Sequence, residues 1–133
     1  MKLRRFLRDT GGAAAIELAL VALPLILLTL GTAELGRALF MQQSLSHAAT
    51  AAARQLHIAP TTTAAALKTV ALGHMTLADP AQLGVTLGLP VAVSGTAIKT
   101  RDLTLTYNFV SALPRLVTSR ISMRVVRTVV MDR

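Results

Sequence analysis

A single carboxylate inside an apolar stretch is the first group in this sequence that could take part in chemistry. Glu17 is the only charged residue between Ala13 and Ala33. Two glycines, Gly11 and Gly12, lie directly before that stretch. Cleavage of the peptide bond after Gly12 would leave a free α-amino group on Ala13. Residues four apart lie on the same side of a helix, so this amine and the Glu17 carboxylate are placed to form an ion pair.

Two interpretations of Glu17 follow from its position. The ion pair with the Ala13 amine would be strongly attractive in a medium of low dielectric constant, within one subunit or between neighbours. Alternatively, Glu17 is a tolerated charge near the end of a membrane span, where a carboxylate costs less than at the bilayer centre.

The remaining polar residues do not form a recognisable catalytic or metal-binding pattern. The chain has no cysteine, which excludes disulfides, thiolate zinc sites and a cysteine nucleophile. His47 and His57 would lie about 15 Å apart along a helix, and we expect them and His74 to face solvent. The acids that follow the apolar stretch are widely spaced, so no general acid/base pair is indicated. We therefore expect no enzymatic activity, no cofactor and no small-molecule substrate.

The composition is that of an aliphatic, basic chain. Of the 133 residues, 53% are hydrophobic, 15% are charged and only 3% are aromatic, with a formal net charge of +8. With so few aromatic residues, a base-stacking surface is not expected. The basic residues are spread along the chain apart from the N-terminus, so we expect no nucleic-acid partner.

The apolar stretch must be positioned by a helix that crosses a membrane. Residues 13–33 would form a helix about 31 Å long, close to the thickness of the hydrocarbon core of a bilayer. Pro24 lies inside this span and predicts a kink. Basic residues precede the span and predict a cytoplasmic N-terminus and an exported C-terminal part. These residues are Lys2, Arg4, Arg5 and Arg8.

Several motifs then combine into a family resemblance. Gly12 is followed by three small residues, an apolar residue and Glu17, and then by ALVALPLILLTLG with its proline. After these come AELGRALF and an alanine-rich segment that ends in AAARQL at Leu56. The combination resembles the N-terminal domain of TadE-like proteins, the pseudopilins or minor pilins of the tight-adherence (Flp) pilus machinery. Leu18 stands where major pilins of this type usually carry an aromatic residue, which favours the TadE-like class.

The resemblance implies how the chain matures and what it contacts. A prepilin peptidase would cleave after Gly12, removing residues 1–12 as a basic leader and keeping the apolar helix. The product would be a single-pass protein of the bacterial inner membrane that supports pilus assembly without catalysis. Its partners would be the lipid bilayer, the prepilin peptidase and other pilin and pseudopilin subunits.

Two other classes of protein compete with this interpretation. Gly31, Thr32 and Ala33 present small residues where signal peptidase reads them, so the chain could be a secreted soluble binding protein with a Sec signal peptide cleaved after Ala33. The apolar stretch is longer than the usual 7–15 residues of a signal peptide, and Glu17 is out of place in one. An unprocessed membrane-anchored enzyme subunit is disfavoured because no catalytic constellation is present.

Beyond the span, the pattern predicts a continuation of the helix over residues 34–58. Its amphipathic stripe would pack on the rest of the exported part or on helices of other subunits. The expected stripe consists of Leu35, Leu39, Met41, Leu45, Ala48, Ala49, Ala52 and Leu56. Residues 59–84 are expected to hold a short helix over 64–72, capped by Thr62 or Thr63 and stopped by Gly73, and a connector.

Residues 85–133 alternate apolar and polar side chains and predict three antiparallel strands. The first, over 85–93, contains Pro90 and is therefore an edge or bulged strand. Turn residues over 94–102 precede a strand at 103–109, and a loop over 111–119 leads to a last strand at 121–131 with a bulge at Val125–Val126. The fold class is α+β, with a pilin-like long N-terminal helix on a small three-stranded sheet. Basic residues of the last strand could form a positive strip, namely Arg120, Arg124, Arg127 and Arg133.

Overall fold

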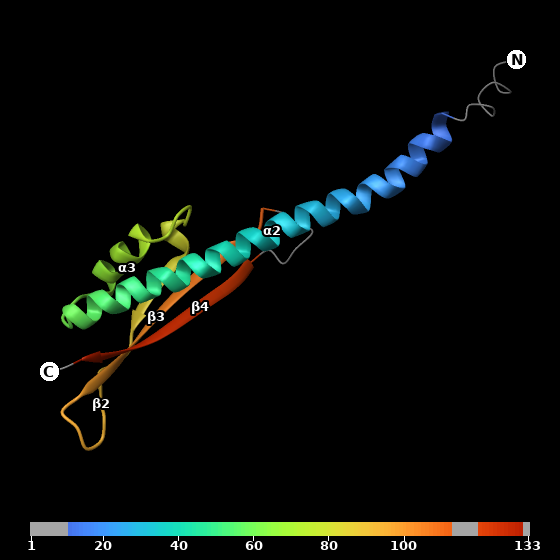
Figure 1. Ribbon diagram of the computed structural model, residues 1–133. Helices are drawn as coiled ribbons and strands as arrows, with labels where there is room; N and C mark the ends of the chain where they lie inside the picture. The colour runs from blue at the N-terminus through green and yellow to red at the C-terminus, as the bar shows by residue number, and fades with distance from the viewer. Residues whose placement is uncertain (1–10, 113–119, 132–133) are drawn as a thin grey trace, which may run out of the picture. The chain divides into compact units, whose positions relative to one another are not determined.

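Figure 1 shows the computed structural model of the chain, which describes residues 11–112 and 120–131. The chain divides into two compact units, Met1–Leu35 and Gly36–Arg133, and each is described by itself. The basic residues Lys2, Arg4, Arg5 and Arg8, together with most of the expected loop over 111–119, lie outside the described residues.

The first element is the helix α2, Gly11–Ile58, which contributes to both units. It is rich in Ala and Leu, which have high helix propensity, and its assigned range includes Pro24. The kink expected at Pro24 stays a prediction, as do the expected boundaries after residues 12 and 33.

In the second unit, one side of α2 is buried along a stripe with steps of three and four residues. It consists of Ala38, Met41, Leu45, Ala48, Ala49, Ala52 and Leu56. Leu35 and Leu39 were expected on this stripe, and that prediction is wrong, because both side chains are exposed. The buried stripe continues from Met41 to Ala38, three residues earlier in the chain. Leu39, one residue after Ala38, therefore lies on another side of the helix.

The segment after α2 holds the short helix α3, Ala64–Gly73, close to the range expected from the sequence. Thr63 is its N-cap, and the Thr63 hydroxyl accepts a hydrogen bond of 3.3 Å from the N–H of Ala66. Leu67 and Ala71 of α3 are fully buried. A single turn of 3-10 helix, η1, Pro80–Gln82, follows and leads directly into the sheet.

The described sheet is antiparallel and has four strands, not the three expected. They are β1 (Leu83–Leu87), β2 (Val91–Ala92), β3 (Lys99–Val110) and β4 (Arg120–Met131). β1 and β2 both pair with β3, and β4 pairs with β3 along its whole length. The expected single strand over 85–93 is therefore interrupted, since Pro90 has no N–H with which to continue the ladder.

The turn expected over 94–102 is shorter than predicted. β3 begins at Lys99, and the polar residues Lys99 to Asp102 belong to the strand. The chain turns between Val93 and Ile98, whose N–H and carbonyl groups are joined by a 2.9 Å hydrogen bond. Gly95 has a φ of 78°, a conformation that favours glycine, within this turn.

The bulge expected at Val125–Val126 is absent from the described ladder. The β3–β4 register is continuous from Lys99 opposite Met131 to Val110 opposite Arg120. The alternation of apolar and polar residues in the sequence shifts here because an apolar residue, Val126, lies on the outer face of the sheet. The next residue, the charged Arg127, lies on the face that packs against α2. The Arg127 guanidinium donates a 3.1 Å hydrogen bond to the Ser46 hydroxyl of α2, which satisfies this polar group on the inner face.

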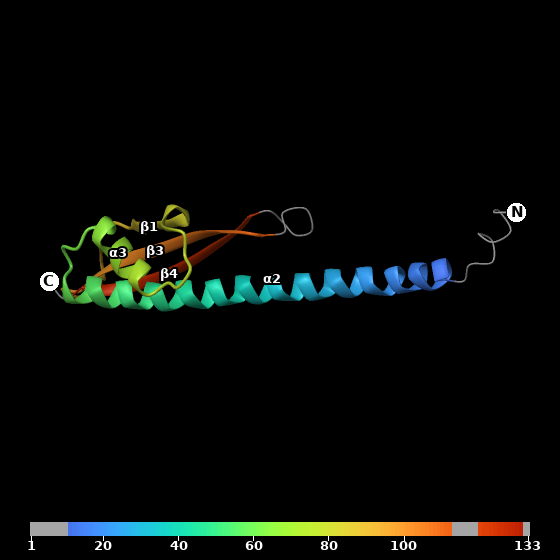
Figure 2. The ribbon, with the colours of Figure 1, turned by 90° about the horizontal axis from the view of Figure 1, so that it is seen from above.

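The core of the second unit lies between the helices and one face of the sheet. Within this unit, α2 runs along the sheet with α3 beside it (Figure 2). Four apolar residues on the inner face of β3 are buried: Leu103, Leu105, Tyr107 and Phe109. The α+β class, with a long N-terminal helix and a small antiparallel sheet, is therefore confirmed.

Candidate functional site

The first unit presents an apolar helical surface. Ten large aliphatic side chains between Ile16 and Leu30 are each 40–70% exposed. The 18-residue window of α2 with the highest mean hydropathy, 2.4, has no buried residue. Burying one such side chain away from water is worth about 1.5–3 kcal/mol, so this surface is suited to a hydrocarbon environment. The helix is long and apolar enough to cross a bilayer.

Two threonine hydroxyls in this segment are satisfied within the helix. The Thr29 hydroxyl donates to the carbonyl of Leu25, and the Thr32 hydroxyl donates to the carbonyl of Leu28, each at 2.7 Å. Such bonds return the hydroxyl groups to the backbone of the previous turn. They matter in a bilayer core, where water is not present to bond polar groups.

The residues singled out for processing lie at the start of α2. Gly12, Ala13 and Glu17 are exposed and belong to the first two turns of the helix. Glu17 follows Ala13 by four residues, a rise of about 6 Å, which places both on one side of the helix. A Cβ added at Gly12 would meet no atom within 4 Å in the folded chain. Any requirement for glycine here would therefore come from a partner such as a peptidase.

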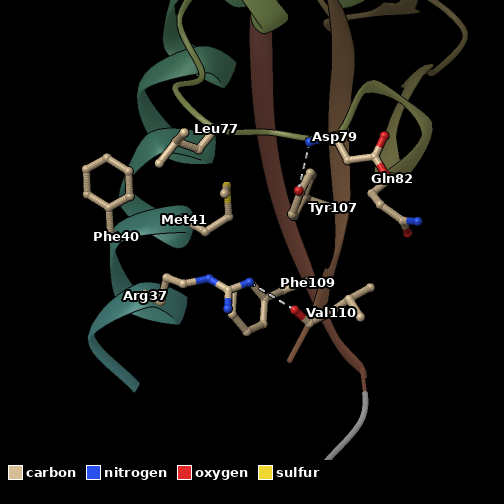
Figure 3. A pocket seen from close by; sticks show the side chains of 9 residues that line it. All are labelled: Arg37, Phe40, Met41, Leu77, Asp79, Gln82, Tyr107, Phe109 and Val110. Atoms are coloured by element: carbon tan, nitrogen blue, oxygen red, sulfur yellow. Dashed lines mark hydrogen bonds between the residues drawn. The ribbon is translucent and has the colours of Figure 1, made fainter. Parts of the chain in front are cut away.

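The second unit contains a pocket that the sequence did not predict (Figure 3). Its volume is about 230 Å³, and α2, the segment before β1, and β3 contribute its lining. The guanidinium of Arg37 lies 4.7 Å from the ring centre of Phe109 and donates a 3.1 Å hydrogen bond to the carbonyl of Val110. The Tyr107 hydroxyl accepts a 3.1 Å hydrogen bond from the N–H of Asp79.

These polar contacts fix the pocket wall and do not assemble a reacting group. Asp79 is held by hydrogen bonds of both its N–H and its carboxylate. Its N–H donates to the Tyr107 hydroxyl, and its carboxylate accepts a 2.9 Å hydrogen bond from the N–H of Ala81 and so caps η1. The cation–π and hydrogen-bond contacts of Arg37 hold α2 against the end of β3. The pocket is therefore a structural junction with an apolar rim.

The rim includes a leucine in an unusual conformation. Leu77 has a φ of 64° and a side chain that is 87% exposed. A left-handed conformation costs a non-glycine residue roughly 1–2 kcal/mol. Sequence reasoning passed over Leu77 because it lies in a connector without periodicity. Phe40, which also lines the pocket, was overlooked because it lies outside the expected apolar stripe.

The expected positive strip on β4 is divided between two faces. Arg120 and Arg124 lie on the outer face of the sheet, whereas Arg127 lies on the inner face and binds Ser46. Because successive side chains of a strand alternate in direction, an odd sequence separation puts Arg124 and Arg127 on opposite faces. Arg133 lies outside the described residues.

The histidines are scattered, as the sequence indicated. His47, His57 and His74 are exposed, and the Nδ1 atom of His57 lies 2.7 Å from the carbonyl oxygen of Val130. Within residues 11–112 and 120–131, no three His, Cys, Asp or Glu residues are grouped so that they could hold a metal ion.

Comparison with known proteins identifies the N-terminal third of the chain. The family model described as TadE-like protein matches residues 12–54. No curated protein and no solved structure matches the chain. The resemblance to TadE-like proteins is thus confirmed for a segment that begins at Gly12 and includes the whole exposed apolar part of α2. This match and the long apolar helix fit a pilin-like protein associated with the tight-adherence pilus.

Proposed function

We propose that this chain is a membrane-anchored pseudopilin or minor pilin that supports assembly of a tight-adherence (Flp) pilus. One observation carries the proposal. The segment that matches the TadE-like family, residues 12–54, contains both the apolar surface of the first unit and the start of the packed stripe of the second. Its role is structural: the chain supplies a membrane helix and an exported α+β unit.

Maturation in this proposal consists of one cut after Gly12. A prepilin peptidase removes residues 1–12 on the cytoplasmic side, and the new α-amino group of Ala13 pairs with the Glu17 carboxylate. The exposure of Gly12, Ala13 and Glu17 supports this step. A peptidase needs access to Gly12, and a partner subunit needs access to Glu17. Other pilin and pseudopilin subunits are the partners against which the apolar helix packs.

The N-terminal residue of the mature chain tests the proposal. The protein is expressed together with the prepilin peptidase, purified from membranes and analysed by intact mass. A chain that begins at Ala13 is the expected result. A chain that begins at Glu34 would identify the apolar stretch as a Sec signal peptide and would contradict the proposal. A chain that still begins at Met1 would mean an unprocessed anchor and would contradict the maturation step.

A further inference from the structure

We propose that the free edge of β4 binds an acidic β-strand of a partner protein, which extends the sheet by one strand. We call this surface the β4 edge. It consists of the outward-pointing backbone groups between Ser122 and Thr128 and the groove beside them. All of its residues belong to the second unit. The inference adds a partner-binding surface to the proposed function and does not rest on cleavage of the leader.

β4 lies at one margin of the sheet. It pairs with β3, and β3 pairs on its other side with β1 and β2. Among the strands of the described residues, no other pairs with β4. This margin is twelve residues long, whereas β1 at the opposite margin has five. A long strand at the margin of a sheet presents N–H and carbonyl groups that can pair with a strand of another chain.

One hydrogen bond establishes which residues of β4 present their backbone groups at this edge. The N–H of Gly88, just beyond β1, donates a 2.8 Å hydrogen bond to the carbonyl of Asp102, so the backbone groups of Asp102 point toward β1. In an antiparallel ladder this direction alternates, so Leu103 points toward β4, where it pairs with Arg127. The backbone groups of Arg127 therefore face β3. By the same alternation, the groups that face away from the sheet are those of Ser122, Arg124, Val126 and Thr128.

Two carbonyls of this edge are covered by side chains of the described residues. The guanidinium of Arg127 donates a 3.3 Å hydrogen bond to the carbonyl of Val126, and the Nδ1 atom of His57 lies 2.7 Å from the carbonyl oxygen of Val130. Both carbonyls belong to the outward-pointing set, as the alternation requires. The contact with His57 closes the edge at the end of β4, so the stretch that a partner strand can reach precedes Val130.

A polar groove runs beside the same stretch. Its volume is about 320 Å³, and it is lined by Gln42, Gln43 and Ser46 of α2 and by residues 124–127 of β4. Four successive residues of a strand include both of its faces, so they line one groove only along the edge of the strand. The groove therefore lies where a further strand would add. Partner side chains directed toward α2 would meet amide and hydroxyl groups, which favours polar side chains there.

The charges at this edge select an acidic strand. β4 carries three arginines, Arg120, Arg124 and Arg127, and no acidic residue. Residues 36–133 contain ten basic and three acidic residues, a formal charge of +7. Opposite charges on neighbouring strands stabilise a sheet, and like charges directly opposite each other destabilise it. A second copy of this chain would bring the same arginines to the contact, so the partner is a different chain with carboxylates on its strand.

Amide hydrogen exchange of the full-length chain in detergent micelles, measured by nuclear magnetic resonance, tests the inference. The probe is a short peptide of alternating glutamate and threonine, and the control peptide has lysine in place of glutamate. We expect the acidic peptide to slow exchange of the Arg124 and Val126 amides at least about tenfold, because they become hydrogen-bonded. The Val85 amide is the internal control. It points away from β3 at the margin formed by β1, which carries no charge, and its exchange should not change.

Substitutions separate the contribution of the backbone from that of the charge. Val126→Pro removes one outward-pointing N–H and keeps the β3–β4 ladder, since proline is tolerated where the N–H of an edge strand faces solvent. It should abolish the slowing at the Arg124 amide, whereas Val126→Ala should retain it. Arg124→Gln leaves the backbone unchanged and should weaken binding of the acidic peptide. Arg54→Gln, at an exposed position of α2, should not.

Three results would overturn the inference. Unchanged exchange at Arg124 and Val126 in excess acidic peptide means that the edge accepts no strand. Equal slowing by the lysine peptide, or at Val85, means that charge does not select the partner. Protection of Arg124 that grows with the concentration of the chain, without peptide, means that the occupant is a second copy. None of these readouts depends on whether the chain begins at Met1 or Ala13, so their failure is distinct from failure of the proposed function.

Discussion

The two halves of α2 are built from similar residues but are buried in opposite ways. Between Ile16 and Leu30 the aliphatic side chains are distributed around the helix and exposed. Between Ala38 and Leu56 the apolar side chains form a stripe that is covered by the sheet and α3. Both halves have a composition that favours helix, and the distribution of apolar residues around the axis distinguishes their surroundings. The first half is suited to lipid, and the second to a protein core.

The largest expected effect concerns the start of the first half. Gly12→Val should abolish removal of the leader, because a peptidase that reads a small residue before the cut cannot accept a branched side chain. Intact mass of the membrane fraction gives the result. Gly31→Val is the matched control, since neither glycine has an atom within 4 Å of an added Cβ. Equal processing of the two variants would show that Gly12 is not recognised.

Glu17→Val separates maturation from assembly. Removal of the leader should proceed, because the cut lies at Gly12, whereas incorporation into the pilus machinery should be lost with the carboxylate. Co-purification with other pilus subunits measures incorporation, and Glu17→Asp should restore part of it. Full incorporation of Glu17→Val would contradict the ion pair and would favour Glu17 as a tolerated interfacial charge.

A pair of leucine substitutions tests the difference in burial between the two regions directly. Leu105→Ala should destabilise the second unit by about 2–5 kcal/mol, since Leu105 is fully buried and its truncation leaves a cavity. Leu25→Ala, at an exposed position of the first unit, should leave the unfolding of the sheet unchanged. Denaturant unfolding in detergent, followed by circular dichroism, compares the two variants. Similar losses from both would mean that the units do not unfold independently.

The smallest expected effect concerns the cap of α3. Thr63→Ala removes the hydroxyl that accepts from the N–H of Ala66 and should cost about 1 kcal/mol of stability. Thr63→Ser should retain most of that stability, because serine is also a good N-cap. Thr61→Ala, at an exposed neighbouring position, should change little. The midpoint of denaturant unfolding measures the stability of each of the three variants.

The regular parts of the fold were predictable because their periodicity is strong. The alternation from Leu103 to Phe109 correctly predicts the inward face of β3. Thr63, one of the two expected caps, is the N-cap of α3, and the helix ends at Gly73, one residue later than expected. The bulge in the last strand was wrongly predicted because alternation assumes that every inward residue is apolar. Arg127 breaks that assumption, and its bond to Ser46, a residue 81 positions away, cannot be inferred from local sequence.

The candidate sites also differ in how clearly the sequence reveals them. The apolar segment and Glu17 stand out in the sequence, since their signal is a run of neighbouring residues. The pocket beside Arg37 is assembled from α2, the connector before β1 and β3 by tertiary folding, so no local pattern reveals it. Leu77, which is 87% exposed and has a φ of 64°, lies in a connector without periodicity, so the sequence does not reveal it.

Cysteine labelling of the mature protein tests most directly whether the apolar segment is retained in the membrane. The chain has no cysteine, so Leu25→Cys and Leu89→Cys each place a single thiol in an otherwise unreactive protein. Spheroplasts are treated with a membrane-impermeant maleimide, and the membrane fraction is analysed by mass. We expect Leu89→Cys to be labelled and Leu25→Cys to be present but protected. Labelling of Leu25→Cys, or recovery of a soluble mature chain that lacks residue 25, would contradict a retained membrane anchor.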